Sequence, residues 1–223
     1  MGFESERLAS TRTLPPSYTA IWGLDLLKDQ RAAVLLNVAA LPLFALSGWI
    51  FSLIASTFKP EIIHKLYIVQ LAAQSLGFFL ALVGTIVGIV LVHEAIHGIF
   101  FWIYTRSRPV FGLKLLFAYA GAPAWYIPRD QYAIIGLAPL IIITVAGLVL
   151  TPFLSLPIGQ LTLLVITVNA AGAVGDLYVV SKTLCQSRDV LVCDTGVGFT
   201  MFGEVKSSVA MKGQNVDGVS AHE

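Results

Sequence analysis

The chain has 223 residues, of which 57% are hydrophobic and 12% are charged, and its formal net charge is +1. An ordinary soluble domain carries about twice this share of charged residues, so the composition argues against a soluble protein. The near-neutral charge leaves no basic surface for a nucleic-acid partner, and two cysteines are too few for a disulfide framework. We therefore expect a mainly α-helical, polytopic membrane protein embedded in a lipid bilayer.

Residues 1–30 form a polar N-terminal segment, with acidic residues and prolines in place of a basic start and an apolar run. We therefore expect no cleavable signal peptide. The short amphipathic piece at 18–27 has two interpretations. Its aromatic side chains would either rest at the level of the lipid headgroups or belong to a solvated lead-in.

Two long apolar segments follow, at 32–58 and 71–104. Each exceeds the about 20 residues that a helix needs to cross a bilayer, and Pro42 is expected to kink the first. The second would be roughly 51 Å long as a helix, so it should tilt, bend or project beyond the membrane. Its Gly84 and Gly88 have the spacing that suits close packing between membrane helices.

The second apolar segment contains the sequence His93-Glu94-Ala95-Ile96-His97-Gly98. On a helix the two histidines lie on one face, where their ring nitrogens can hold one zinc ion. Glu94 lies beside them, within reach of a metal-bound water but not placed as a ligand. No other residue from 77 to 103 is ionisable, and one charge inside a bilayer costs on the order of 3 kcal/mol. We interpret the three residues as a catalytic zinc site; the alternative is a polar group satisfied by neighbouring helices.

Between 106 and 129 the apolar pattern changes to a period of two. Every second residue from Leu113 to Tyr119 is large and hydrophobic, residues 121–123 form a turn signal, and 124–127 can return as a second strand. This pattern predicts a membrane-associated β-hairpin at 111–127 that lies at, or dips into, the membrane surface. An amphipathic linker is the alternative interpretation.

Two further apolar segments, at 132–156 and 158–180, complete a set of four predicted transmembrane helices. The first contains Pro139. The second has Asn169 and Asp176 as its only strongly polar residues.

The sequence becomes polar after the last apolar segment. Short strands are predicted at 189–193 and 199–205, joined by the turn residues 194–198, and the residues after 206 have the composition of a disordered tail. The expected organisation is an N-terminal segment at 1–30, a transmembrane core at 31–182, a cytosolic β-hairpin tail at 183–206 and a disordered tail at 207–223.

The distribution of basic residues predicts the orientation. With four spans, twelve of the fourteen lysines and arginines fall on the side that holds both termini, and only Lys59 and Lys65 fall on the other. Because cytoplasmic segments are enriched in lysine and arginine, we expect a multi-pass protein of the cell membrane with both termini in the cytosol.

A catalytic zinc usually has three protein ligands and one position for water. Asp176 is the remaining carboxylate within the spans, and the topology places it in the same half of the bilayer as the histidines. Counted along the helices, Asp176 would lie about 9 Å and His97 about 14 Å from the cytosolic end. We expect Asp176 to be the third ligand; the alternative is a helix-end aspartate capped by water or an arginine.

Together these motifs resemble the bacterial putative zincin membrane peptidases, which are distantly similar to the site-two intramembrane metalloproteases. The resemblance covers most of residues 14–205. It is carried by the motif at 93–98, the loop at 122–128, Pro139, the segment 169–176 and the short strands of the tail.

In the site-two proteases two histidines and a distal aspartate hold zinc, a glutamate activates water, and an asparagine contacts the substrate. The resemblance assigns the metal to His93, His97 and Asp176, the catalytic role to Glu94 and the substrate contact to Asn169. The order Gly175-Asp176-Leu177 differs from the Leu-Asp-Gly of those proteases. The metal site therefore carries over more firmly than the proteolytic activity.

These observations favour a zinc-dependent intramembrane endopeptidase that acts on a membrane protein or peptide. The zinc would polarise the scissile carbonyl and lower the pKa of its water towards 7, Glu94 would pass the proton to the leaving amine, and the hairpin would offer an edge for strand addition. The alternatives are a zinc-binding or zinc-sensing protein and an inactive, partner-binding relative. Glu94 favours the enzyme, and the lack of paired repeats disfavours a transporter.

Overall fold

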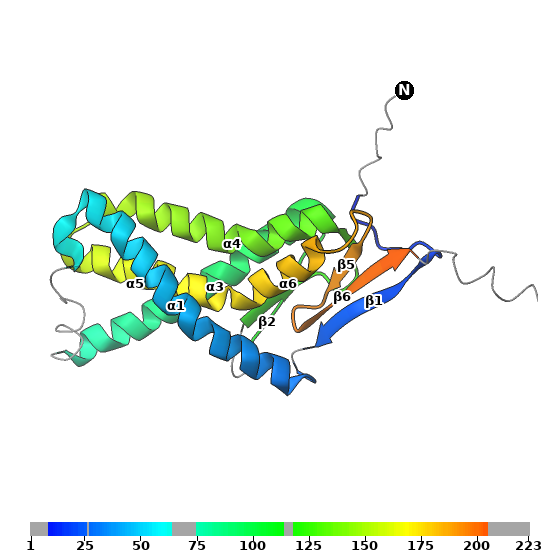
Figure 1. The fold of residues 1–223 in the computed structure, drawn as a ribbon, viewed down its shortest axis with the longest axis horizontal. Coiled ribbons are helices and arrows are strands. Elements are labelled where there is room, and N and C mark those ends of the chain that lie inside the picture. Colours follow the sequence, from blue (N-terminus) through cyan, green and yellow to red (C-terminus); the bar gives the residue numbers. More distant parts are fainter. Residues whose placement is uncertain (1–8, 26, 64–74, 114–117, 205–223) are drawn as a thin grey trace, which may run out of the picture.

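The computed structural model describes residues 9–25, 27–63, 75–113 and 118–204. These residues are mainly helical, with small antiparallel sheets gathered towards one end of the helices (Figure 1). The long helices are α1 (Gln30–Phe58), α3 (Leu76–Thr105), α4 (Arg129–Leu150), α5 (Leu156–Gly172) and α6 (Val174–Leu184). Short 3-10 turns follow α1 at Pro60–Ile63 and α4 at Thr151–Phe153.

Three helical stretches of the described residues are long and apolar enough to cross a membrane: Gln30–Phe58, Leu76–Thr105 and Arg129–Phe153. The consecutive helices α5 and α6 pass the same test as a bent pair. The four apolar segments predicted from the sequence therefore correspond to helices. The start of the second predicted span, at 71–74, lies outside the described residues, as does the predicted disordered tail at 207–223.

The fourth predicted span is not one continuous helix. It is divided at Ala173, and the axes of α5 and α6 differ by 45°. Gly172 and Gly175 flank the break, and glycine costs about 1 kcal/mol relative to alanine inside a helix. The prediction of an unbroken helix over 158–180 is therefore wrong. The break has a consequence for the site, because it places Asp176 in the first turn of α6.

The larger sheet has four antiparallel strands in the order β1-β6-β5-β4. Strands β5 (Leu191–Asp194) and β6 (Gly198–Glu204) form the hairpin predicted for the tail. The outer strands are β1 (Tyr18–Asp25), which pairs along β6, and β4 (Ile127–Pro128), which pairs with β5. Residues 18–25 of the amphipathic piece predicted at 18–27 thus form a strand of this sheet, an interpretation that its sequence did not suggest.

The smaller sheet is a hairpin of β2 (Val110–Leu113) and β3 (Ala118–Gly121). A hairpin was predicted in this region, but its position was wrong: Leu113 pairs with Ala118, and Ile127 joins the other sheet. The reason lies at Gly121, where a Cβ atom would be 2.6 Å from the backbone nitrogen of Gly196. The next residue, Ala122, donates its N–H to the carbonyl of Asp194 at 2.9 Å. These contacts end β3 and lead the chain into the larger sheet.

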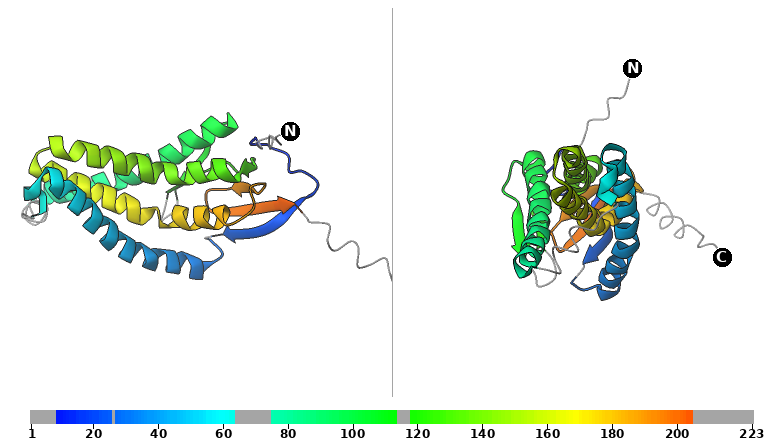
Figure 2. Two further views of the ribbon diagram at one scale, coloured as in Figure 1. Left: turned by 45° about the horizontal axis from the view of Figure 1, so that its top comes forward. Right: turned by 90° about the vertical axis from the view of Figure 1, so that its left-hand side faces the viewer.

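Two clusters of buried apolar side chains hold the fold together. One, which includes Phe101, Ile127 and Met201, joins α3 and α4 to the strands. The other, which includes Ile96 and Ile166, joins α3 to α1, α4 and α5. Helix α5 packs against both α1 and α3, which lie on either side of it (Figure 2). The motif at 93–97 therefore lies on α3 between the two clusters, where neighbouring helices fix its position.

Candidate metal centre

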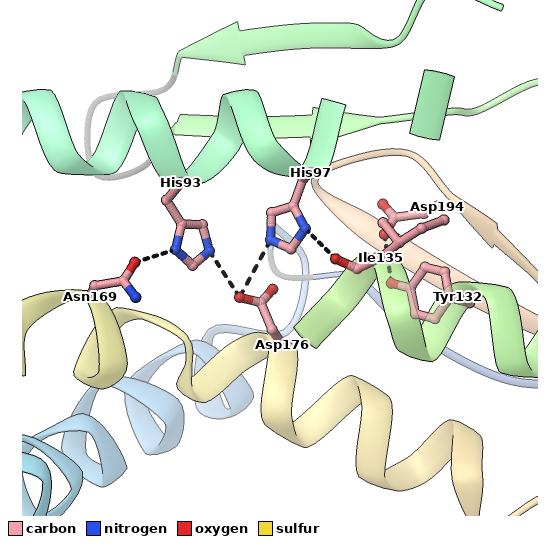
Figure 3. A network of polar contacts seen from close by, with 7 residues as sticks. All are labelled: His93, His97, Tyr132, Ile135, Asn169, Asp176 and Asp194. Carbon is pink, nitrogen blue, oxygen red and sulfur yellow. Dashed lines mark hydrogen bonds and ion pairs between the residues drawn. The ribbon is translucent and has the colours of Figure 1, made fainter. Parts of the chain in front are cut away.

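The two histidines and the aspartate selected from the sequence meet at one point (Figure 3). His93 and His97 lie one turn apart on α3, and both direct Nε2 towards Oδ2 of Asp176, at 3.1 Å and 3.5 Å. One donor atom from each residue lies within 4.8 Å of the others. Ligands about 2.1 Å from a tetrahedral zinc lie about 3.4 Å from one another, so the donor set and its spacing fit this ion.

The ring of His93 is oriented by a side chain of α5. Its Nδ1–H donates to Oδ1 of Asn169 at 2.9 Å, and Asn169 is only 4% exposed. Because an amide oxygen accepts and does not donate, Nδ1 carries the proton and Nε2 keeps its lone pair for a metal. A metal-bound histidine commonly has such a partner on its other nitrogen.

The ring of His97 is oriented by the backbone of α4. Its Nδ1–H donates to the carbonyl oxygen of Ile135 at 2.9 Å, and both residues are buried. The two histidines are therefore oriented alike, with Nδ1–H donating and Nε2 directed to Asp176, although one is fixed by a side chain and the other by the main chain.

The third residue of the group, Asp176, is placed by a close contact between α4 and α6. A Cβ atom at Gly136 would lie 2.5 Å from Cγ2 of Val180, so only glycine allows this approach without a shift. Val180 follows Asp176 by one helical turn and lies on the same side of α6. The contact at Gly136 therefore holds the first turn of α6, and with it the carboxylate of Asp176, close to α3.

Glu94 lies at the same cavity but stands outside the group that could hold the metal. The cavity has a volume of about 400 Å³ and is also lined by both histidines, Asp176 and Asn169. The backbone N–H of Ala120 in β3 donates to the Glu94 carboxylate. Glu94 also lines a second cavity of about 350 Å³ between α3 and the β2–β3 hairpin. It is thus held beside the metal position at the junction of two cavities.

All five residues assigned to a site from the sequence come together in the first cavity. The arrangement of Asn169 was not foreseen, because its Oδ1 accepts from His93. Its Nδ2 is buried and has no hydrogen-bond partner among the described residues. A buried donor of this kind is costly to leave unpaired, and here it belongs to a side chain that lines the cavity.

Two further polar residues line the cavity without having been selected from the sequence. Tyr132 in α4 donates its hydroxyl to Oδ2 of Asp194 at 2.6 Å, and Oδ1 of Asp194 accepts from the N–H of Gly196 at 2.6 Å. Burial raises the pKa of the Asp194 carboxyl, and these two hydrogen bonds counteract the rise. An aspartate at the start of a turn is an ordinary sequence feature, so nothing in the sequence marked this pair.

The fold and the centre define the class: a helical protein with several membrane-length apolar helices and a His-His-Asp group that could hold a metal. Residues 86–191 match the model of the family described as putative zincin peptidase. The matched region contains all five site residues and supports a metallopeptidase in general. The match confirms the resemblance to putative zincin peptidases within residues 86–191, and it does not extend to the site-two proteases. No curated protein and no solved structure matched the chain.

Proposed function

We propose that this protein is a zinc-dependent intramembrane endopeptidase that hydrolyses peptide bonds in membrane-associated proteins or peptides. One observation carries the proposal: a carboxylate outside the His-His-Asp group, Glu94, lies at the cavity where three other side chains could hold a metal. A site that only bound zinc would have no use for it. The family match supports the same class of enzyme.

The residues have separate roles in this mechanism. Zinc held by Nε2 of His93, Nε2 of His97 and Oδ2 of Asp176 would supply a Lewis acid that polarises the scissile carbonyl and acidifies a water molecule. The Glu94 carboxylate takes the proton from that water and passes it to the leaving amine nitrogen. The N–H of Ala120 keeps the Glu94 carboxylate turned towards the cavity.

The substrate is proposed to bind as an extended strand along β3. One edge of β3 pairs with β2, whereas the N–H of Ala120 points to Glu94, so its other edge faces the site. Ala118 lines both cavities. Strand addition at this edge would present the peptide backbone to the metal position, and Nδ2 of Asn169 would donate a hydrogen bond to a substrate carbonyl.

The fold supports the proposed topology. The N-terminal strand β1 and the C-terminal strands β5 and β6 belong to one sheet at the same end of the helices (Figure 1). Both ends of the helical core therefore connect to the same side of a membrane that the helices cross. The excess of basic residues on that side supports the proposal that it is the cytosol.

The decisive experiment combines metal analysis with the Glu94→Gln variant. Purified wild-type protein should contain one zinc per chain, and Glu94→Gln should retain it. Native membranes incubated with the two proteins should give new peptide N-termini only with the wild type, as identified by mass spectrometry. A wild type without zinc would refute the metal site. Zinc without any difference in cleavage would favour an inactive zinc-binding or partner-binding protein.

A further inference from the structure

Helix α4 contains a proline at its centre without being interrupted. The helix runs from Arg129 to Leu150, Pro139 lies within it, and the Pro139 side chain is fully buried. Proline has no backbone N–H, so the carbonyl four residues before it lacks its helical donor, and the ring pushes that carbonyl away from its usual direction. In α4 this carbonyl belongs to Ile135.

The carbonyl of Ile135 is the group that orients His97. The distance from Nδ1 of His97 to the oxygen is 2.9 Å, and Ile135 is 1% exposed. A buried backbone carbonyl requires a hydrogen-bond donor, and a buried imidazole N–H requires an acceptor. Because residue 139 has no N–H, the Ile135 carbonyl is available as an acceptor for the Nδ1–H of His97.

We propose that Pro139 is a positioning residue of the metal centre. Because Pro139 has no N–H, the Ile135 carbonyl can accept a hydrogen bond from His97. This hydrogen bond keeps a proton on Nδ1 of His97 and directs Nε2 to the metal position. The inference rests on the metal site of the proposed function, but it does not depend on whether the protein cleaves peptides.

The chain contains a matched control for this proposal. Helix α1 also has an internal proline, Pro42, which removes the helical donor of the Val38 carbonyl. Val38 is 57% exposed and lies on the outer surface of α1. The same substitution at the two prolines therefore restores the same backbone hydrogen bond, but only one of these bonds competes with a proposed metal ligand.

The test is the zinc affinity of the purified full-length protein, measured by competition with a chelator. Pro139→Ala restores an N–H that competes for the Ile135 carbonyl, and we expect its zinc affinity to fall about 10- to 100-fold, the effect of losing the outer partner of a metal-bound histidine. Pro42→Ala should bind zinc like the wild type. An α-hydroxy acid incorporated at position 139 has neither the ring nor the N–H, and it should also keep the wild-type affinity.

A second measurement detects the cause independently of the metal. The chain has four histidines, so ¹⁵N NMR of histidine-labelled protein can follow His97 in the absence of zinc. In the wild type and the hydroxy-acid variant the Nδ1–H of His97 should exchange slowly with solvent, because the Ile135 carbonyl accepts it. In Pro139→Ala, where that carbonyl has a competing donor, the same proton should exchange faster. Thermal unfolding of each variant shows whether it folds.

Each outcome decides the proposal. Equal zinc affinities of Pro139→Ala and wild type would overturn it and leave the proposed function intact. Weak binding by the hydroxy-acid variant would overturn it as well, because the shape of the ring would then matter and not the missing N–H. If Pro139→Ala does not fold, the hydroxy-acid variant decides alone: full affinity supports the proposal and reduced affinity refutes it. A wild type without zinc would overturn both the metal site and this inference.

Discussion

The two halves of α3 have similar hydrophobic sequences but different surroundings. In the first half, a Cβ atom added at Gly84 or Gly88 would find no described atom within 4 Å, and Leu80 and Val87 are exposed. In the second half, Ile96, His97 and Phe101 are buried between helices and strands. Hydropathy alone does not separate the exposed surface of α3 from the surface that lines the cavity. The polar residues of the motif mark where the helix enters the packed part of the molecule.

The largest effect is expected from removing a residue of the proposed metal site, to which the packed half of α3 contributes two histidines. His93→Ala, His97→Ala and Asp176→Ala each leave two of the three protein ligands, so all three should lose zinc during purification. Glu94→Gln should keep zinc and lose activity about 100- to 10,000-fold, the range for a general base. Metal analysis and peptide cleavage distinguish the two classes. Full zinc occupancy in Asp176→Ala would show that the third ligand comes from elsewhere.

The next effect concerns the side chain that orients His93. Asn169→Ala removes the acceptor of Nδ1–H, and we expect the zinc affinity to fall about 10- to 100-fold. Asn37 is the control, because it lines the same cavity from α1 and its Nδ2 donates to the carbonyl of Ala33. Asn37→Ala should leave the affinity unchanged. Equal affinities of Asn169→Ala and wild type in chelator competition would remove the orienting role of Asn169.

The smallest effect tests the comparison of the two halves directly. Gly88→Ala meets open space and should stabilise the helix by about 1 kcal/mol, because alanine is the better helix former. Gly98→Ala places a methyl group 2.2 Å from Cζ of Phe111, so the ring must move. Such overpacking costs about 1–3 kcal/mol, which cancels or exceeds the gain. Unfolding in mild detergent should rank Gly88→Ala above Gly98→Ala, and the reverse order would contradict the assignment of the two surfaces.

Much of the site could be predicted because its residues are polar or ionisable, whereas the segments around them are apolar. Two histidines and a glutamate inside an apolar segment require a reason, and helical spacing alone places His93 and His97 on one face. Asp176 followed by elimination, as the remaining carboxylate within the predicted spans. The separate contributions of Ile135 and Pro139 could not be predicted, because the sequence does not show which carbonyl of α4 faces His97.

The errors in the fold have a common physical cause. An alternating pattern predicts strands but not the point at which they reverse, and so the turn of the β2–β3 hairpin was misplaced. Strand β1 was not recognised because its pairing depends on β6, at the other end of the chain. The break between α5 and α6 had a signal in Gly172 and Gly175, but glycines are also common in continuous membrane helices.

The pairing of β1 with β6 sets the order in which the molecule can be completed during synthesis. Tyr18 in β1 pairs with Glu204 in β6. Because a ribosome adds about 5–20 residues per second, β6 is synthesised on the order of ten to forty seconds after β1. Leu24 of β1 and Phe199 of β6 both line the cavity that contains Glu94. The wall of this cavity is therefore finished last, after all the helices have been synthesised. A nascent chain would therefore contain His93, His97 and Asp176 before the cavity that they line has its last wall.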